Sequence, residues 1–246
     1  MIRHYFLPLA FILSSSGLYA QDFSGFKKAF EKATNSSPST TSFTEKEAAD
    51  AIKEALSKGI LKGVDIVSVP DGYFKNDLIR ILFPENAKKV ETTLRSAGMG
   101  SQVDKMIETM NHAAENAAKE AIPIFVSAIK QMTVTDAISI INSQQQDAAT
   151  RYLQKTTTEQ LVIAFKPSIK TALDKLNATK YWSDIMSQYN RIPFVQKVET
   201  DLPDYVTRKA ISGLFMMIAQ EEQKIRHDPG ARTSDLLKKV FGNIRH

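Results

Sequence analysis

The chain has 246 residues, a formal net charge of +5, no cysteine and 43% hydrophobic residues. The lack of cysteine excludes disulfides, thiol nucleophiles and thiolate metal sites, so an apolar core must stabilise the fold, and a chain of this length can bury one. The basic excess is small and spread along the chain, without interleaved basic and aromatic residues, so we expect no nucleic-acid partner and at most peripheral contact with a membrane.

Residues 1–20 have the layout of a secretory signal peptide. Arg3 and His4 precede an apolar run, residues 5–13, and small and polar residues follow as far as Ala20. The apolar run is too short to cross a bilayer. We therefore predict cleavage near Ala20 and a periplasmic or secreted protein.

Residues 21–43 are predicted to form an amphipathic stretch followed by a flexible linker. The segment from Asn35 to Ser42 consists of Ser, Thr, Asn and one Pro, a composition that favours turns over regular structure. An all-helical domain is then expected over residues 44–242.

The first helix of this domain is predicted to begin with a capping box formed by Thr44 and Glu47. Gly59 and Gly63 lie one turn apart on its apolar face. Because glycine has no side chain, the pair would let another backbone approach closely.

The middle of the chain predicts a turn and then two helices. Pro70-Asp71-Gly72 indicates the turn, and residues 78–83 are ambiguous between a short strand and an extended connection. A helix is expected from Pro84 to Gly98. Ser101 is the expected cap of a long alanine-rich helix, which Pro123 should kink or split.

Further helices are predicted up to the C-terminus. They are expected after a capping pair of Thr133 with Asp136, over residues 148–155, over 158–176 with Pro167 inside, over 180–190, from Pro203 to just before Pro229, and over 236–240 with Thr233 as cap. The predicted fold class is therefore all-α: a single compact multi-helix domain of about eight or nine helices, after a signal peptide and a flexible tether.

The sequence from about Ala48 to Gly242 carries a series of short motifs. They are Pro70-Asp71-Gly72, Gly98 with Gly100, Asn111 with Ala113-Ala114-Glu115, Asp136-Ala137, Ala148-Ala149-Thr150, Gly213-Leu214-Phe215, Glu221-Glu222 with Ile225-Arg226, and Arg232-Thr233 with Leu236-Leu237. In these motifs the chain resembles a bacterial exported family catalogued as domain of unknown function four-one-nine-seven. The resemblance implies an exported helical domain and supplies no activity, ligand or catalytic residue.

Glu222 is the most informative candidate site residue. On the last long helix it falls inside an apolar stripe, where a carboxylate needs a partner or a shifted pKa. Arg226, one turn later, and Arg232, after Pro229, are the expected partners. The set is either a buried ion pair that fastens the last helices to the core or a carboxylate–guanidinium site that faces a pocket.

Asn111 and Glu115 form a second polar pair, one turn apart on the long alanine-rich helix. An amide at the edge of an apolar face must find hydrogen-bond partners inside the fold. The pair is either a polar clamp between helices or a ligand-binding pocket lining. Whether it meets Glu222 and Arg226 in space is left open by the spacing.

Trp182 and Tyr189 share one helix face, so they either pack in the core or line an aromatic pocket. No catalytic residue, metal or cofactor is predicted. His112 and Glu115 stand three residues apart, yet the second Glu-x-x-His of a di-metal bundle is absent. The sequence also lacks the G-x-S-x-G and H-E-x-x-H motifs and a phosphate-binding loop.

Three functions remain open. The preferred one is a non-enzymatic exported binding module for an apolar or amphipathic ligand or an envelope protein, because apolar helix surface is abundant and nucleophile motifs are absent. The alternatives are an enzyme that uses Glu222, Arg226 and Arg232, and a structural envelope assembly protein.

Overall fold

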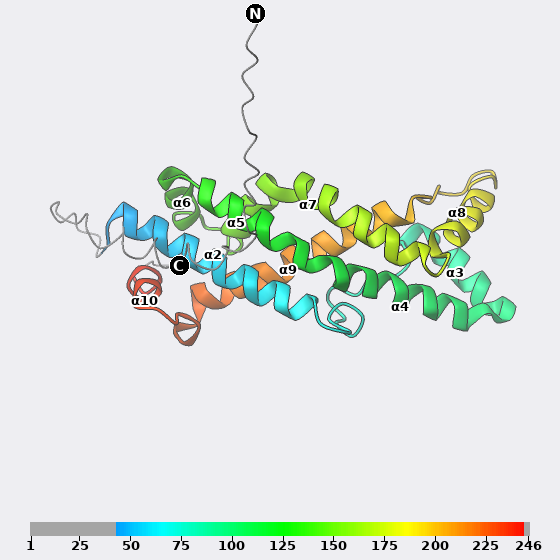
Figure 1. The fold of residues 1–246 in the computed structure, drawn as a ribbon, viewed down its shortest axis with the longest axis horizontal. Coiled ribbons are helices and arrows are strands. Elements are labelled where there is room, and N and C mark those ends of the chain that lie inside the picture. The colour runs from blue at the N-terminus through cyan, green and yellow to red at the C-terminus, as the bar shows by residue number, and fades with distance from the viewer. Residues whose placement is uncertain (1–42, 244–246) are drawn as a thin grey trace, which may run out of the picture. The chain divides into compact units, whose positions relative to one another are not determined.

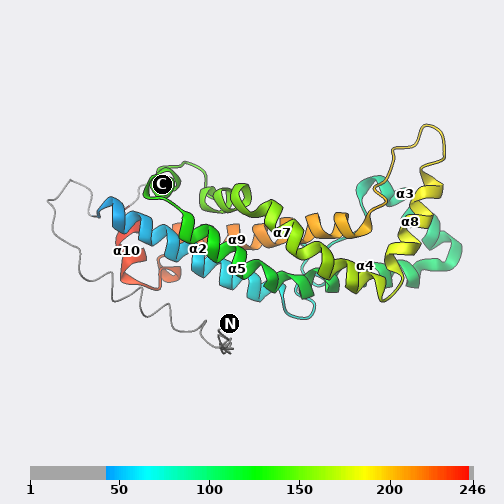
Figure 2. The same cartoon turned by 45° about the horizontal axis from the view of Figure 1, so that its top comes forward.

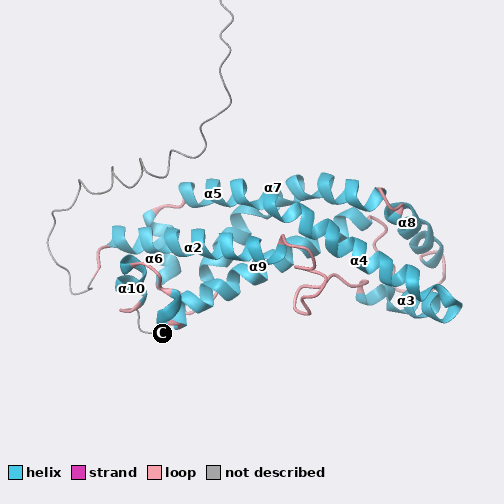
Figure 3. Ribbon diagram, turned by 60° about the horizontal axis from the view of Figure 1, so that its bottom comes forward, coloured by secondary structure: helices cyan, strands magenta, loops and turns pink. Residues whose placement is uncertain are grey.

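The computed structural model describes residues 43–243 and contains helices but no strand in that range (Figure 1, Figure 3). The all-α fold class is therefore confirmed for this part of the chain. The predicted signal peptide, residues 1–20, and all but the last residue of the predicted stretch 21–43 lie outside the described residues.

The helices are α2 (Glu45–Val67), α3 (Lys88–Leu94), α4 (Gly100–Ala117), α5 (Ala121–Gln131), α6 (Val134–Ile141), α7 (Ala148–Asp174), α8 (Ala178–Tyr189), α9 (Leu202–His227) and α10 (Asp235–Phe241), with the short turns η1 (Glu85–Ala87), η2 (Arg95–Met99), η3 (Ala118–Glu120) and η4 (Pro229–Ala231). Within residues 43–243 no single helix is long and apolar enough to cross a membrane. One pair bent by 99°, Glu85–Gln131 with Val134–Ile141, has the length and composition to do so together.

Helix α9 is central to the core. It contacts α2, α4, α7, α8 and α10, and its longest contacts run along α2 and α7 (Figure 1). Its inward face is apolar and fully buried at Leu202, Val206, Ala210 and Leu214. A polar side chain on this face of α9 is therefore enclosed by other helices.

Helices α2 and α9 approach closely at the two glycines that the sequence singled out. A Cβ atom at Gly63 would lie 3.0 Å from Cγ1 and 3.3 Å from the backbone nitrogen of Ile218. At Gly59 a Cβ atom would lie 3.7 Å from Cβ of Glu221. A side chain at Gly63 would push the helices apart, so the close approach that these glycines predicted is confirmed.

Both predicted capping boxes are present. At the start of α2, Thr44 N donates to Glu47 Oε2 at 2.8 Å and Glu47 N donates to Thr44 Oγ1 at 3.2 Å. At the start of α6, Thr133 and Asp136 exchange the same two bonds at 2.9 and 3.1 Å. These bonds satisfy backbone N–H groups that have no partner within their helices.

Two other predicted caps are wrong. The cap of α10 is Ser234, whose Oγ accepts from Leu237 N, because the helix begins one residue later than Thr233 would require. Ser101 caps nothing, because α4 begins at Gly100 and continues from the preceding turn η2. A helix that continues from a helical turn has few unpaired N–H groups for a side chain to bind.

Helices α3, α4 and α5 follow one another without a loop. Gly98, in η2, has φ of +82° and bends the run there, and η3 lies just before Pro123, at the predicted split. Counted as segments separated by loops, the described residues contain seven helices, fewer than the eight or nine expected.

Helix α7 is a single helix where the sequence predicted two. The expected break at residues 156–157 is absent because the threonines there remain helical. The hydroxyls of Thr156, Thr157 and Thr158 donate to carbonyl oxygens one turn earlier, at 2.6–2.9 Å. Pro167 lies inside this helix, as predicted.

Asp50, on α2, is a half-buried carboxylate whose Oδ2 has no hydrogen-bond partner among the described residues. Burial raises the pKa of this carboxyl above its ordinary value, against the opposing charges of Lys46 and Lys53. A raised pKa in the folded state means that ionisation destabilises the fold as the pH rises above the unfolded value.

We therefore expect Asp50→Asn to raise the free energy of unfolding at pH 7 by up to about 1 kcal/mol. Urea titrations at pH 7 and at pH 3 measure the gain. It should vanish at the lower pH, where the wild-type carboxyl is also neutral. An equal gain at both pH values would mean that charge is not the cause.

Candidate functional site

Glu222 and Arg226 form a buried ion pair on α9. Glu222 is 6% exposed and Arg226 is 1% exposed. Arg226 Nε and Nη2 both donate to Glu222 Oε1, at 2.9 and 2.8 Å, and Nη2 lies 3.5 Å from the carbonyl oxygen of Ile140 on α6. The spacing of four residues places both side chains on one helix face, so the ion pair predicted from the sequence is present.

The same carboxylate binds the first turn of α7. Ala149 N donates to Glu222 Oε1 at 3.0 Å, and the N and Oγ1 of Thr150 both donate to Oε2 at 2.8 Å. The residue before α7, Asp147, makes no side-chain capping bond of its own. Glu222 therefore caps α7 from another helix, with its negative charge at the positive end of the helix dipole.

Little space remains around Glu222. Its two oxygens accept five hydrogen bonds from Ala149, Thr150 and Arg226. The adjoining cavity is lined by apolar residues of α2, α7, α9 and α10 together with Glu222 and Arg226. It measures about 10 Å³, enough for a single water molecule. A ligand would have to displace either the guanidinium or the start of α7.

Arg232 does not bind Glu222. The turn η4 brings it back to α9, as expected, but its Nε donates to the carbonyl oxygen of Ile225 at 2.9 Å and its Nη2 to that of Arg226 at 2.6 Å. These carbonyls belong to the last turn of α9, which has no helical N–H to pair with them. The expected partnership is therefore corrected: Arg232 caps the C-terminal end of α9.

Asn111 binds the connection between α2 and α3. Asn111 is fully buried. Its Oδ1 accepts a hydrogen bond from Ile81 N at 2.8 Å. Its Nδ2 donates to the carbonyl oxygens of Ile81 at 2.8 Å and of Ile107 at 2.7 Å. The amide thus pairs with both backbone groups of Ile81, as a neighbouring strand would. Residues 77–79 form a turn and residues 80–84 form an irregular connection rather than a strand, with Asn111 in place of a partner strand beside Ile81.

Glu115, one turn later on α4, holds the turn that begins this connection. It is 5% exposed; its Oε1 accepts from the backbone nitrogens of Tyr73 at 3.0 Å and Phe74 at 3.1 Å, and its Oε2 from that of Asp71 at 3.2 Å. Asp71 has φ of +66°. Such turns point successive N–H groups to one side, where they can bind an anion.

Tyr73 links this turn to α9. Its hydroxyl donates to the carbonyl oxygen of Ala210 at 2.6 Å, and burial, followed by the nearby Glu115 charge, raises the pKa of the hydroxyl well above its ordinary value. A Cβ atom at Gly213 would lie 2.8 Å from Tyr73 Cε1 and 3.1 Å from Cβ of Ile79. The sequence reasoning missed Tyr73; its place beside the Asp71-Gly72 turn was the available signal.

We expect Gly213→Ala to lower the free energy of unfolding by about 1–3 kcal/mol, because the added methyl group collides with the Tyr73 ring. Alanine normally favours a helix over glycine by about 1 kcal/mol, so the sign of the change tests the packing. Equilibrium urea unfolding measures it. The control is Ser212→Ala at the exposed neighbour, and a more stable Gly213→Ala variant would contradict the packing described.

The two polar clusters are separate. Tyr73 reaches α9 at Ala210, whereas Glu222 lies three turns further along the same helix, a distance of about 18 Å at 1.5 Å per residue. No partner residue is shared between the bonds of Asn111 and Glu115 and those of Glu222 and Arg226 among the described residues. They form two anchors rather than one site.

Trp182 lies in the core. It is 1% exposed, its Nε1 donates to the carbonyl oxygen of Glu199 at 2.8 Å, and its ring meets Phe83 edge-on at 5.1 Å and stacks on Tyr205 at 6.4 Å. Tyr189, two turns later on α8, is half-buried against the same core. Trp182 thus fixes the chain that enters α9.

His112 lies beside the Glu115 cluster. Its Nε2 is 3.5 Å from Asp71 Oδ1 and 3.9 Å from Glu115 Oε2, and its ring meets Phe74 edge-on at 5.9 Å. Within residues 43–243 no group of three or more His, Asp or Glu side chains is arranged to hold a metal ion. We therefore describe His112 as a surface residue beside the turn at Asp71.

The chain matches a known protein family. A family model described as protein of unknown function (DUF4197) matches residues 42–242, which is the span of the helical domain. No curated protein and no solved structure matches the chain.

Proposed function

Since the chain belongs to the DUF4197 family of proteins of unknown function, as its motifs predicted, we propose its function from geometry: an exported, non-enzymatic interaction module that binds an apolar or amphipathic partner on its outer surface. The observation that carries the proposal is the internal use of the four buried candidate residues. Asn111, Glu115, Glu222 and Arg226 bind backbone groups or one another, and each fastens one part of the fold to another.

The size of the cavity beside Glu222 supports a surface function over a ligand held between the helices. Pockets for small molecules measure about 300–1,000 Å³, far more than the 10 Å³ found beside this pair. The core is filled by large side chains such as Trp182, Phe125 and Phe165, each at most 1% exposed. These observations favour a partner bound outside the helices over a ligand enclosed between them.

An enzymatic role for Glu222 receives no such support. A general acid or base must reach its substrate at hydrogen-bond distance. Here the carboxylate is occupied by α7 and Arg226, while Arg232 binds the end of α9. The arrangement suits a structural joint.

Exposed apolar side chains supply the surface for binding. Ile163 on α7 is 75% exposed, Leu78 in the α2–α3 connection is 62% exposed and Phe194 after α8 is 107% exposed. Single exposed apolar residues are common. These three are the most exposed large apolar side chains of the described residues, so they are the positions to test for contact with a partner.

Two measurements on the chain as the cell produces it test the proposal. Native mass spectrometry without delipidation should give the mass of the bare chain, because the cavity beside Glu222 is too small for a ligand. Photo-cross-linking in cells, with benzoylphenylalanine introduced in turn at Leu78, Ile163 and Phe194, should give adducts at one of these positions. A retained stoichiometric small molecule, or no adduct at any position, would overturn the proposal; an adduct with a second copy would indicate assembly.

A further inference from the structure

The loop between α8 and α9 projects beyond the ends of the helices it joins (Figure 2). It spans residues 190–201, and we call residues 191–197 its tip. Every tip residue is exposed except Val195, which is half-buried. Phe194 is 107% exposed and Ile192 53%.

The base of this loop is rigidly held. Asn190 Nδ2 donates to the carbonyl oxygen of Val198 at 2.9 Å, and Val198 N donates to Asn190 Oδ1 at 2.8 Å. Asn86 Nδ2 donates to the carbonyl oxygen of Lys197 at 2.7 Å, and Trp182 binds the next residue but one. Three side chains, through four hydrogen bonds, thus fix the direction in which the tip points.

Phe194, at the tip, has a backbone conformation that is unusual for an aromatic residue. Phe194 has φ of +63°, a conformation that favours glycine and is rare for a bulky side chain. Its ring makes none of the aromatic contacts found elsewhere in the described residues. Glycine would adopt this backbone conformation with less strain, and a fully exposed ring does not stabilise the fold. These two facts point to a function for the ring itself.

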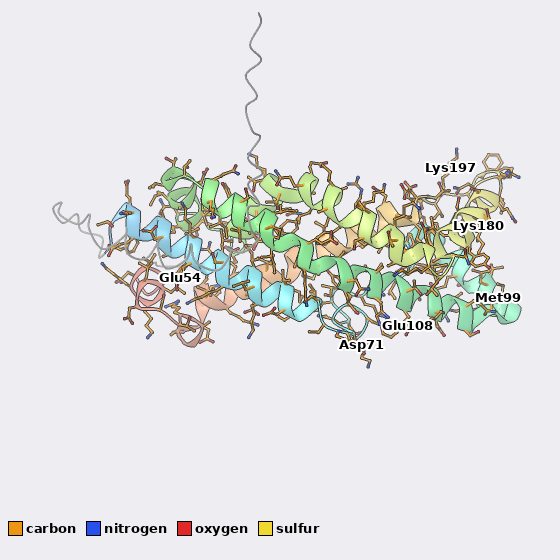
Figure 4. All side chains as sticks on the ribbon, viewed as in Figure 1. Glu54, Asp71, Met99, Glu108, Lys180 and Lys197 are labelled. Atoms are coloured by element: carbon orange, nitrogen blue, oxygen red, sulfur yellow. The ribbon has the colours of Figure 1, made fainter. Side chains whose placement is uncertain are left out.

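The charged residues of the tip itself are both basic, and the acidic residues of the loop, Glu199 and Asp201, stand at its base. Arg191 and Lys197 stand at its two ends, both exposed, and the sequence from Gln188 to Val198 contains no acidic residue. Figure 4 shows Lys197 at the end of the bundle where α8 lies. An apolar tip between two cations matches an anionic lipid surface, which offers phosphate groups above an apolar interior.

The size of the tip favours a bilayer over a protein partner. A stable protein interface buries about 1,200–2,000 Å² in total, far more than two apolar side chains on a narrow loop can supply. A bilayer needs no complementary pocket, and short apolar insertions combined with a few cations are sufficient for peripheral binding.

We propose that the α8–α9 loop inserts Ile192 and Phe194 into the interface of an anionic phospholipid bilayer while Arg191 and Lys197 bind lipid phosphates. The inference rests on the proposed surface-binding function and names its partner. The contact is peripheral, reversible and weakened by salt.

Vesicle co-sedimentation with the purified full chain tests the inference. Binding to phosphatidylglycerol–phosphatidylethanolamine vesicles should exceed binding to phosphatidylcholine vesicles and fall as salt is raised. Phe194→Gly should weaken it about tenfold, because the ring no longer enters the apolar layer. Arg191→Gln with Lys197→Gln should weaken it about thirtyfold.

Two controls separate binding from folding. Phe194→Gly relieves the backbone strain, so its thermal midpoint should equal or exceed that of the wild type while binding falls. Leu61→Ser removes a 52% exposed apolar side chain from α2, outside the positions proposed for binding, and should leave vesicle binding unchanged. Equal binding by wild type and Phe194→Gly, or no preference for anionic vesicles, would overturn the inference.

Photo-cross-linking from position 194 in cells separates this inference from the proposed function. Adducts with phospholipid support both. Adducts with a protein alone overturn the membrane inference and leave the surface-binding function standing. No adduct at position 194 or at Leu78 and Ile163 overturns both.

Discussion

Replacing Glu222 by alanine is expected to lower the free energy of unfolding by about 3–5 kcal/mol, because Arg226 is then left buried without its counter-charge. The change also removes the acceptor for Ala149 N and Thr150 N at the start of α7. One substitution therefore removes the contacts that hold α9 to the start of α7. Equilibrium urea denaturation, followed by circular dichroism, measures the loss.

Glu221 provides the matched control for this prediction. It is the neighbouring residue, also a glutamate, and it pairs with Lys224 at 2.6 Å on the more exposed side of α9. Glu221→Ala should cost less than about 1 kcal/mol, as partly exposed pairs do.

A second variant tests the cause of the Glu222 effect. The double variant Glu222→Leu with Arg226→Leu removes both charges, so it should be more stable than Glu222→Ala. If Glu222→Ala cost no more than Glu221→Ala, the buried ion pair would not be the joint described here.

Replacing Glu115 by alanine is expected to lower the free energy of unfolding by about 3 kcal/mol. The backbone N–H groups of Asp71, Tyr73 and Phe74 would lose their acceptor, and a buried N–H without a partner costs about 1–3 kcal/mol. Amide hydrogen exchange should also become faster within the α2–α3 connection, since Glu115 holds its first turn.

Glu108, two turns earlier on α4, is the control for Glu115→Ala. It lies toward the solvent near Asp71 (Figure 4) and pairs only with Lys105 among the contacts of the described residues. Glu108→Ala should change stability by no more than about 0.5 kcal/mol. Unchanged exchange in the connection after Glu115→Ala would contradict the anchoring role.

Features set by neighbouring residues were predictable from the sequence. The capping boxes of Thr44 and Thr133 depend on a side chain three residues away, and the Glu222–Arg226 pair depends on a spacing of four. The threonines at 156–158 misled the prediction because threonine has a modest helix preference, which packing inside α7 overrides.

The partners of the candidate site residues could not be predicted. Glu222 binds Thr150 across 72 residues of sequence, and Asn111 binds Ile81 across 30. In both cases the partners include backbone N–H groups, which every residue except proline carries and which therefore leave no mark in the sequence. The hydroxyl of Tyr73 binds a backbone carbonyl oxygen, which every residue carries, so the sequence did not indicate its partner on α9; its place beside the Asp71-Gly72 turn was the available signal.

The packing of an early segment on the last long helix affects how the chain is made. The carbonyl that accepts the hydrogen bond of the Tyr73 hydroxyl belongs to a residue 137 positions later in the sequence. A ribosome that adds 5–20 residues per second synthesises that residue roughly 7–27 seconds after Tyr73. Until α9 has been synthesised, the face of α2 that packs against it, including Gly63, stays exposed. Synthesis of α9 therefore sets the moment at which this domain can close, and a nascent chain that stops before it exposes the interior of an unfinished protein.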